Sequence, residues 1–309
     1  MDDGHAGHIT FADLEMFLSF AKFEHFGHAA AELEVSTATV QRGVRALERK
    51  LGIELIEQVG RRVRLRHTGH VLVREAHQVL RARLDAVDTT RAESGQPHRL
   101  LRIAHTYSLG LEFVPSVLAE LVALHPELRL HCRQNSATEV VSILLRGEAD
   151  VAFTSMSPTE ADIVVEPLFT ESLLLALPSR DPLSERAGVS LREVRDRPFV
   201  AMELGSSSRT HMVNACARAG FVPRIAIEGS DLFVVESMVG AGLGVSVVPE
   251  GMNDHSHPRV VRLLIEDPPS TRTIFLAFPR TSAVQRSVRA LARIARARAR
   301  TRKAEGSLH

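Results

Sequence analysis

The sequence contains few cysteines, few aromatic residues and no long apolar run. It has 2 cysteines, 1 tyrosine and no tryptophan. Cys132 and Cys216 lie far apart without CxxC spacing, so we expect no disulfide framework or structural zinc site, only buried and inert thiols. His255 and His257 lack a third ligand, so no metal site or cofactor is expected. No stretch approaches the roughly 18 apolar residues that cross a bilayer, and residues 1–5 lack the pattern of a secretory signal. We therefore expect a cytoplasmic protein with no membrane partner.

The composition and length predict a folded chain of more than one domain. The 309 residues exceed one ordinary core, and 44% are hydrophobic and 24% charged. The net charge of +1 hides an uneven distribution. Residues 1–34 contain Lys22 as their only Lys or Arg against 7 acidic residues, whereas residues 36–66 contain 8 basic and 3 acidic residues. This contrast favours a polyanionic partner, although a solvated charged face explains the charge alone equally well.

Three helical patterns occupy the first 52 residues. The first begins after Thr10, the second covers residues 28–33, and the third follows Ser36 as an N-cap and ends before Gly52. Apolar residues of the third helix recur at Val40 and Val44 and continue at helical spacing. Its opposite face is polar and mostly able to bond phosphates or base edges. This arrangement is typical of a helix-turn-helix, whose second helix enters the DNA major groove.

Two short strands are expected to follow, over residues 55–58 and 62–65, with Gly60 at the hairpin tip. Arginines at such a tip can reach phosphates or the minor groove beside the recognition helix. The hairpin is therefore interpreted as a wing. The expected DNA-binding residues are Ser36, Thr37, Thr39, Gln41, Arg42, Arg45, Arg61, Arg62 and Arg64.

A long helix is expected from about residue 68 to 93. Its apolar stripe is narrow and suits a partner helix, so we predict a dimerising linker; the alternative is a helix packed on its own domain. The stripe consists of Val73, Ala76, Leu80, Leu84 and Val87. Residues 94–97 break the helix and indicate a hinge. The predicted domains are 1–67 for DNA binding, 68–98 for linker and hinge, and 99–309 for an effector-binding domain.

Beyond residue 99 short apolar strands alternate with helices. Residues 101–153 predict strand–helix–strand–helix–strand and a mainly parallel sheet, and a second block runs from residue 173 to 249. The segment 274–278 and the closing helix could return to the first block. We therefore predict an α/β protein overall, with an N-terminal all-α winged helix-turn-helix and a two-lobed C-terminal domain. Lobe I comprises about 99–163 and 268–309, and lobe II about 164–267.

Hydroxyl side chains follow several predicted strands. Ligands of open α/β sheets bind at the carboxyl ends of strands, where helix N-termini present free N–H groups. We predict a small anionic or hydroxylated effector, such as a carboxylate metabolite or sugar acid, although Ser and Thr at such positions serve equally well as helix caps. The expected effector-binding residues are Thr106, Tyr107, Ser108, Ser136, Thr154, Ser206 and Ser207.

The order of these segments resembles one family. Residues 14–69, especially 26–33, 44–52 and 60–65, resemble the DNA-binding domain of LysR-type transcription regulators. Residues 100–104, 125–128, 145–152 and 239–245 resemble their effector domain, which is similar to the type 2 periplasmic binding-protein fold. The resemblance implies a ligand-responsive regulator and not an enzyme. It also implies a homotetramer on a double-stranded DNA operator, with RNA polymerase as a partner if the protein activates.

Departures from the family pattern affect sequence preference more than fold. Thr37 stands where the family often has Gln, and Ala38 stands where it often has Pro or Ser. Gln41 stands where the family often has Ser, and a Gln side chain can pair with adenine. Three other functions compare differently with the sequence. A regulator with a non-responsive sensor is consistent with the same sequence. A solute-binding protein conflicts with the helix-turn-helix and the missing secretory signal, and a serine hydrolase conflicts with the missing GxSxG motif.

Overall fold

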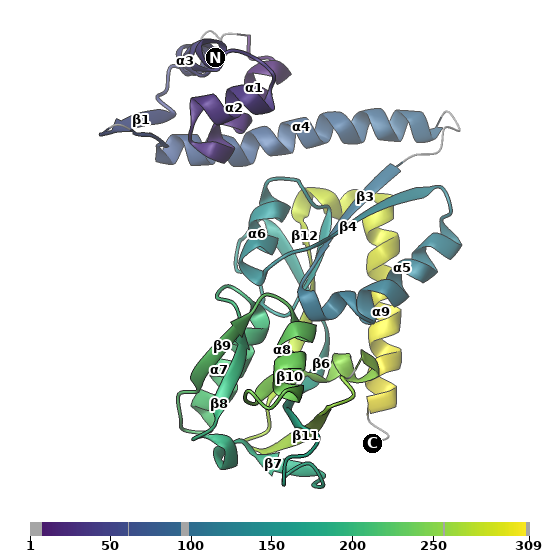
Figure 1. Cartoon of the computed structure of the whole chain (residues 1–309). Helices are drawn as coiled ribbons and strands as arrows, with labels where there is room; N and C mark the ends of the chain where they lie inside the picture. Colours follow the sequence, from purple (N-terminus) through teal and green to yellow (C-terminus); the bar gives the residue numbers. More distant parts are fainter. Residues whose placement is uncertain (1–7, 61, 94–98, 256, 307–309) are drawn as a thin grey trace. The chain divides into compact units, whose positions relative to one another are not determined.

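The computed structural model describes residues 8–60, 62–93, 99–255 and 257–306 (Figure 1). Contacts divide the chain into two compact units, one of Met1–Arg99 with Leu145–Gly147 and one of Leu100–Leu144 with Glu148–His309. Among the described helices, none is long and apolar enough to cross a membrane.

The first unit is a winged helix-turn-helix followed by a long helix. Its elements are α1 (Phe11–Phe23), α2 (Phe26–Glu32), α3 (Thr37–Leu51), β1 (Ile56–Val59), β2 (Arg62–Leu65) and α4 (His67–Glu93). Thr10 and Asp13 form a capping box at the start of α1. Fully buried side chains from the first three helices, among them Phe17, Val40 and Leu47, form one core beneath the hairpin.

The two ends of helix α4 differ in their surroundings. Near its start, Val73 packs against the core of the winged domain and Ala76 is buried. Further along, Leu84 and Val87 are 48% and 42% exposed. The first turns of α4 therefore belong to the winged domain, while the distal turns present apolar side chains to solvent.

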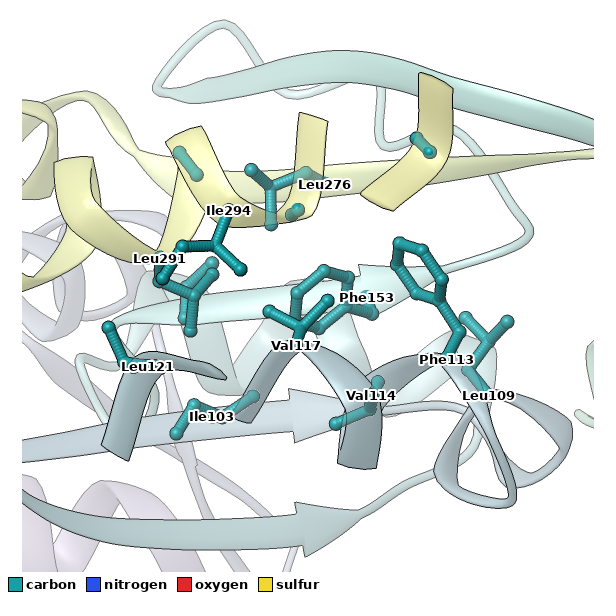
Figure 2. Packing of buried hydrophobic residues seen from close by; sticks show 14 of the residues in the cluster. Ile103, Leu109, Phe113, Val114, Val117, Leu121, Phe153, Leu276, Leu291 and Ile294 are labelled. Carbon is teal, nitrogen blue, oxygen red and sulfur yellow. The ribbon is translucent and has the colours of Figure 1, made fainter. Parts of the chain in front are cut away.

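Lobe I of the second unit contains the predicted alternation of strands and helices. Its elements are β3 (Arg99–His105), α5 (Phe113–Leu124), β4 (Leu128–Gln134), α6 (Ala137–Leu145) and β5 (Val151–Thr154), closed by α9 (Arg286–Gly306). Figure 2 shows side chains of α5 facing those of α9 and of the sheet. Leu121, Phe153 and Leu291 lie in this core with no exposed surface.

Lobe II is a sheet with a helix on each face. Its elements are β7 (Gly188–Ser190), β8 (Pro198–Met202), α7 (Ser207–Arg218), β9 (Arg224–Gly229), α8 (Leu232–Gly240), β10 (Ser246–Pro249) and β11 (Val260–Asp267). Leu175 packs under α7 with Met212, whereas the adjacent Ala176 packs under α8 with Val235. Neighbouring residues of β6 thus enter two different cores, because successive side chains of a strand point to opposite faces of the sheet.

Two long strands, β6 (Ile163–Pro178) and β12 (Thr271–Pro279), join the lobes. They pair antiparallel from Ile163 opposite Pro279 to Ser172 opposite Thr271, after which β6 pairs with β10 and β11. The strand order is β4-β3-β5-β12-β6-β11-β7, with β10 also on β6 and β8-β9 apart. The main sheet is therefore continuous through both lobes (Figure 1).

A mainly parallel sheet was expected for the strands of residues 101–153, and β3 and β5 are parallel as predicted. Strand β12, which returns to this sheet, is antiparallel to both β5 and β6. One strand begins earlier than predicted. The expected strand began at residue 173, because Glu166 and Pro167 interrupt the apolar pattern before it. In the structure Pro167 lies at a register shift opposite Phe275, a place where a missing N–H is tolerated. No strand was predicted over 260–267, where β11 lies.

We predict that Leu121→Ala lowers the free energy of unfolding of the second unit by about 2–5 kcal/mol, because it empties a fully buried site between α5 and the sheet. Leu124→Ala, on the same helix but 57% exposed, is the matched control and should cost under about 0.5 kcal/mol. Urea unfolding followed by circular dichroism compares them. Equal losses would show that α5 does not bury the face described here.

Candidate functional site

Helix α3 is fixed at both ends by local interactions. The side chain of Ser36 accepts a hydrogen bond from the backbone N–H of Thr39 at 3.1 Å, and Gly52 ends the helix in the left-handed conformation with φ of 67°. Val40 and Val44 are fully buried on the inner face. The inner face therefore sets the rotation of α3 and leaves its opposite face exposed.

The exposed face of α3 carries the side chains predicted to meet DNA. Thr37, Gln41 and Arg42 are exposed and make no hydrogen bond or ion pair with another described residue. The hydroxyls of Ser36 and Thr39 lie 2.8 Å apart and take part in the helix cap. The six-residue stretch from Thr37 to Arg42 thus offers three unengaged polar groups to a ligand.

Glu48 connects α3 to the hairpin. Its carboxylate is buried and accepts the backbone N–H groups of Leu55 at 2.8 Å and Ile56 at 3.1 Å. It also pairs with Arg45 at 2.8 Å. Arg45 is therefore engaged within the protein, although its side chain is 55% exposed. Loss of Glu48 would free β1 from α3.

The hairpin has the predicted form of a wing. Strands β1 and β2 pair antiparallel, and Gly60 between them has φ of 63°. Arg62 is exposed and makes no contact of this kind with another described residue, while Arg61 lies outside the described residues. Arg64 pairs with Glu24, so it too serves a structural contact.

Glu24 holds the wing against the helices. It ends α1 in the left-handed region, with φ of 45°, and its carboxylate accepts the backbone N–H of Leu65 at 2.9 Å beside the ion pair with Arg64. Burial by itself raises the pKa of Glu24. The hydrogen bonds from Leu65 and Arg64 outweigh it, and the pKa lies below its usual range.

A groove of about 800 Å³ lies between α3, the wing and the turn from α1 to α2. Thr37 and Gln41 line it from α3, and Arg62 and Arg64 line it from β2. The structure thus brings four of the predicted DNA-binding residues to one surface. It adds His25 and His28, which the sequence interpretation did not single out because their position beside the wing depends on tertiary packing.

In the second unit the predicted effector residues gather where β3, β4 and β5 end. The backbone N–H of Thr106 donates to Phe153 at 3.1 Å, and that of Asn135 donates to His105 at 2.9 Å. Across from them, Gly205 is so close to Thr138 that an added Cβ would lie 3.3 Å from its hydroxyl. The hydroxyl-rich ends of lobe I therefore lie beside the loop that leads into α7 of lobe II.

Several of these hydroxyls already have partners. Ser136 caps α6 through the N–H of Glu139, Thr154 bonds within its own turn to Met156, and Ser206 caps α7 through the N–H of Ser208. In this structure the hydroxyls of Ser136 and Ser206 therefore cap helices and that of Thr154 closes a turn, in line with the capping alternative. Ser207 is buried on the first turn of α7.

Three further predicted residues differ in their surroundings. Tyr107 packs against the core under α8, which is a structural contact between the lobes. Ser108 accepts a hydrogen bond from Arg272 at 2.7 Å. Thr106 is 1% exposed, and its hydroxyl finds no hydrogen-bond partner within the described part of the chain. An unpaired buried hydroxyl is the feature expected where a ligand or water completes the site.

Two interactions beside this site were missed by the sequence interpretation. His211 on α7 bonds through Nε2 to the hydroxyl of Ser155 at 3.1 Å and so joins the two lobes. Burial, with the nearby charges of Arg272 and Arg218, lowers the pKa of His211 to about 4. Arg272 also binds Glu171 across β12 and β6, with Nε 2.8 Å from Oε1. No spacing rule reveals partners separated by 56 or 101 residues.

The two thiols differ from each other. Cys216 is buried, and burial raises its pKa to about 12, which fits the expected inert thiol. Cys132 is exposed on β4, so the expectation that both are buried was wrong. The described residues contain no group of three potential metal ligands.

Comparison with known proteins follows the same division of the chain. The family model "Bacterial regulatory helix-turn-helix protein, lysR family" matches residues 11–70, and "LysR substrate binding domain" matches residues 94–300. The transcriptional dual regulator GltC of Bacillus subtilis is 29% identical over 270 residues, which are 86% of this chain and 90% of GltC.

Solved structures resemble the whole chain as well. A full-length OxyR variant from Pseudomonas aeruginosa has 27% identity and a TM-score of 0.71, with coverage of 94% of this chain and 95% of OxyR. Full-length CbnR in complex with its target DNA shares the fold, with 24% identity, a TM-score of 0.55 and coverage of 93% and 100%.

We predict that Glu24→Gln destabilises the first unit by about 1 kcal/mol at pH 7, because it removes the charge that binds Arg64 and the Leu65 amide. The folded pKa lies below the unfolded one, so this contribution is present above about pH 4.5 and disappears as the pH falls through the folded value. The gap between wild type and variant should close between pH 5 and 3 in urea titrations. Glu34→Gln, an exposed control, should show no such gap, and a pH-independent gap for Glu24→Gln would contradict the assignment.

Proposed function

The chain belongs to the LysR family of transcription regulators, and from this premise we propose which of its residues read DNA and which bind the effector. Members of the family are DNA-binding regulators with an effector-binding domain and not enzymes. We propose that Thr37, Gln41 and Arg42 contact base edges in the major groove. The observation that supports this most is that they are exposed and unengaged on the outer face of α3.

The surrounding residues divide by role in this proposal. Arg62 and, beyond the described residues, Arg61 contact phosphates from the wing. Arg45 and Arg64 contribute positive charge while they hold Glu48 and Glu24. Ser36 and Thr39 orient the start of α3 through its cap. Phosphate contacts position the protein, whereas Gln41 and Arg42 supply the donors that distinguish adenine and guanine.

We predict that Arg42→Ala weakens binding to the operator by about 5- to 100-fold, because a charged donor to a base or phosphate is lost. The measurement is gel retardation on DNA from upstream of the gene, with competitor, at several salt concentrations. Arg195→Ala, whose side chain is 65% exposed on the second unit, is the control and should bind as wild type. Unchanged specific binding by Arg42→Ala would remove this residue from the reading surface.

For the effector we propose the region between the lobes at the ends of β3, β4 and β5. The unpaired hydroxyl of Thr106 and the unpaired Oδ1 of Asn135 are buried there, and the N-terminus of the 12-residue helix α7 lies on the other lobe. Thr106, Ser207 and the neighbouring hydroxyls would bind a small anionic or hydroxylated metabolite. Effector binding that favours one lobe arrangement would then shift the assembly between DNA-binding states.

We predict that Thr106→Val lowers effector affinity about tenfold while leaving the melting temperature equal or higher, since the substitution removes an unsatisfied hydroxyl without changing side-chain volume much. The effector is first identified as the metabolite that changes gel retardation, and affinity is then measured by calorimetry. Thr159→Val, at an exposed position of the same lobe, should bind normally. No metabolite effect at all would favour the alternative of a non-responsive sensor.

We also propose self-association through α4. An apolar groove of about 600 Å³ between α1 and α4 is lined by Phe11, Leu14 and Val79 among others, and Leu84 and Val87 continue the exposed apolar surface. A second copy of the chain is the occupant we propose, which makes residues 68–98 the linker between the domains 1–67 and 99–309. Pairs of dimers would form the homotetramer on an operator with dyad symmetry, in the cytoplasm, with RNA polymerase as a partner if the protein activates.

A further inference from the structure

The rim of the DNA-facing groove carries two stacked imidazoles that the proposed DNA contacts do not include. The rings of His25 and His28 lie 4.4 Å apart between centroids, at 32° to each other. Both side chains are exposed and both line the groove that Thr37, Gln41 and Arg62 also line. Groups on the same groove as the base-reading residues are within reach of the same DNA duplex.

The two rings differ in their hydrogen bonds. Nδ1 of His25 accepts the backbone N–H of His28 at 3.3 Å and so caps α2. Because Nδ1 is the acceptor in this bond, the ring proton of His25 is on Nε2, which can donate to a ligand. The ring nitrogens of His28 make no hydrogen bond with a described residue, and the edge of its ring meets Phe23 at 5.9 Å. His28 is therefore the ring free to take a second proton.

The charges around the pair are mixed. From α1, Glu24 faces the groove and Lys22 lies over the Phe23 ring at 4.8 Å. From the wing, Arg62 and Arg64 face it, and Arg64 is paired with Glu24. From α3 only the neutral Thr37 and Gln41 line it. Arg64 and Glu24 offset each other, as do Lys22 and Glu32, which leaves Arg62 as the unpaired charge among the described residues that line the groove. An anion that enters the groove would favour a second proton on His28.

Building on the proposed DNA-binding function, we infer that His25 and His28 form a phosphate-binding site for the DNA backbone, at which His28 takes up a proton when DNA binds. Phosphates are the anions that a duplex places along a protein groove of this kind. DNA affinity is then higher at low pH, where the bound state holds the added proton, and falls as the pH rises.

The size of the effect follows from linkage. If DNA favours the protonated form of an imidazole about tenfold over the neutral form, affinity falls roughly sixfold between pH 6 and pH 8. A charged contact with one phosphate also steepens the dependence of log affinity on log salt by about 0.9. The contact is independent of base sequence, so a duplex without an operator reports it.

The test uses the full chain and a fluorescein-labelled 30-base-pair duplex of random sequence, with anisotropy measured at pH 6 and pH 8 over a series of salt concentrations. Wild type should lose about sixfold in affinity from pH 6 to pH 8 and have the steeper salt dependence at pH 6. His28→Gln should bind with nearly the same affinity at both pH values. His28→Arg, which keeps a fixed charge, should bind tightly at both.

Two further variants separate this site from other histidines and from folding. His25→Asn retains a capping side chain and should weaken binding at both pH values by a similar factor, since it removes a neutral donor. His125→Gln, on the second unit, should keep the full pH dependence. Equal melting temperatures verify that the variants are folded.

The inference is overturned if His28→Gln keeps the pH dependence of wild type, or if His28→Arg binds no better than His28→Gln at pH 8. Neither result would affect the proposed function, which depends on operator specificity through Arg42. Failure of wild type to bind any duplex at either pH would contradict the proposed function itself.

Discussion

The buried ion pair between Glu171 and Arg272 connects the two lobes at the strands that belong to both. Their side chains are 4% and 1% exposed, and they face each other across the antiparallel pair of β6 and β12. The N–H of Gly251 donates to Glu171 at 3.0 Å, and Arg272 reaches Ser108 at the end of β3. Breaking such a pair by removing one partner typically costs about 3–5 kcal/mol. Any change in lobe angle must therefore preserve this contact and occur around it.

Carboxylates with a similar set of partners also occur in the first unit. Glu48 and Glu24 each accept backbone N–H groups of the hairpin and each bind an arginine. A carboxylate that holds backbone N–H groups fixes the position of a strand more closely than an ion pair between two flexible side chains would. Three carboxylates, Glu171, Glu48 and Glu24, thus fix strands beside the surfaces proposed to bind the effector and DNA. None of the three is itself among the residues proposed to contact those ligands.

Local patterns in the sequence predicted the features that depend on residues close together in the chain. Helix α3 could be predicted with both ends, because Ser36, the spacing of Val40 and Val44, and Gly52 act locally. The bulge at Pro167 could not, because a proline inside a strand is explained only by its partner Phe275, more than one hundred residues away. The predicted hydroxyl residues lie near the ends of β3, β4 and β5 and at the start of α7. The sequence could not separate Ser136, which caps a helix, from Thr106, whose hydroxyl has no partner among the described residues. The location of His25 and His28 beside the groove was not predicted, because it depends on the position of the wing.

The contact between His211 and Ser155 keeps one protonation state near neutral pH. With a pKa of about 4, the imidazole of His211 is uncharged near neutral pH, so its bond to Ser155 across the lobes does not change there. A fall in pH from 8 to 6 therefore leaves this contact between the lobes in one protonation state. Within that range the bond depends on the geometry of the two side chains and not on the charge of the histidine.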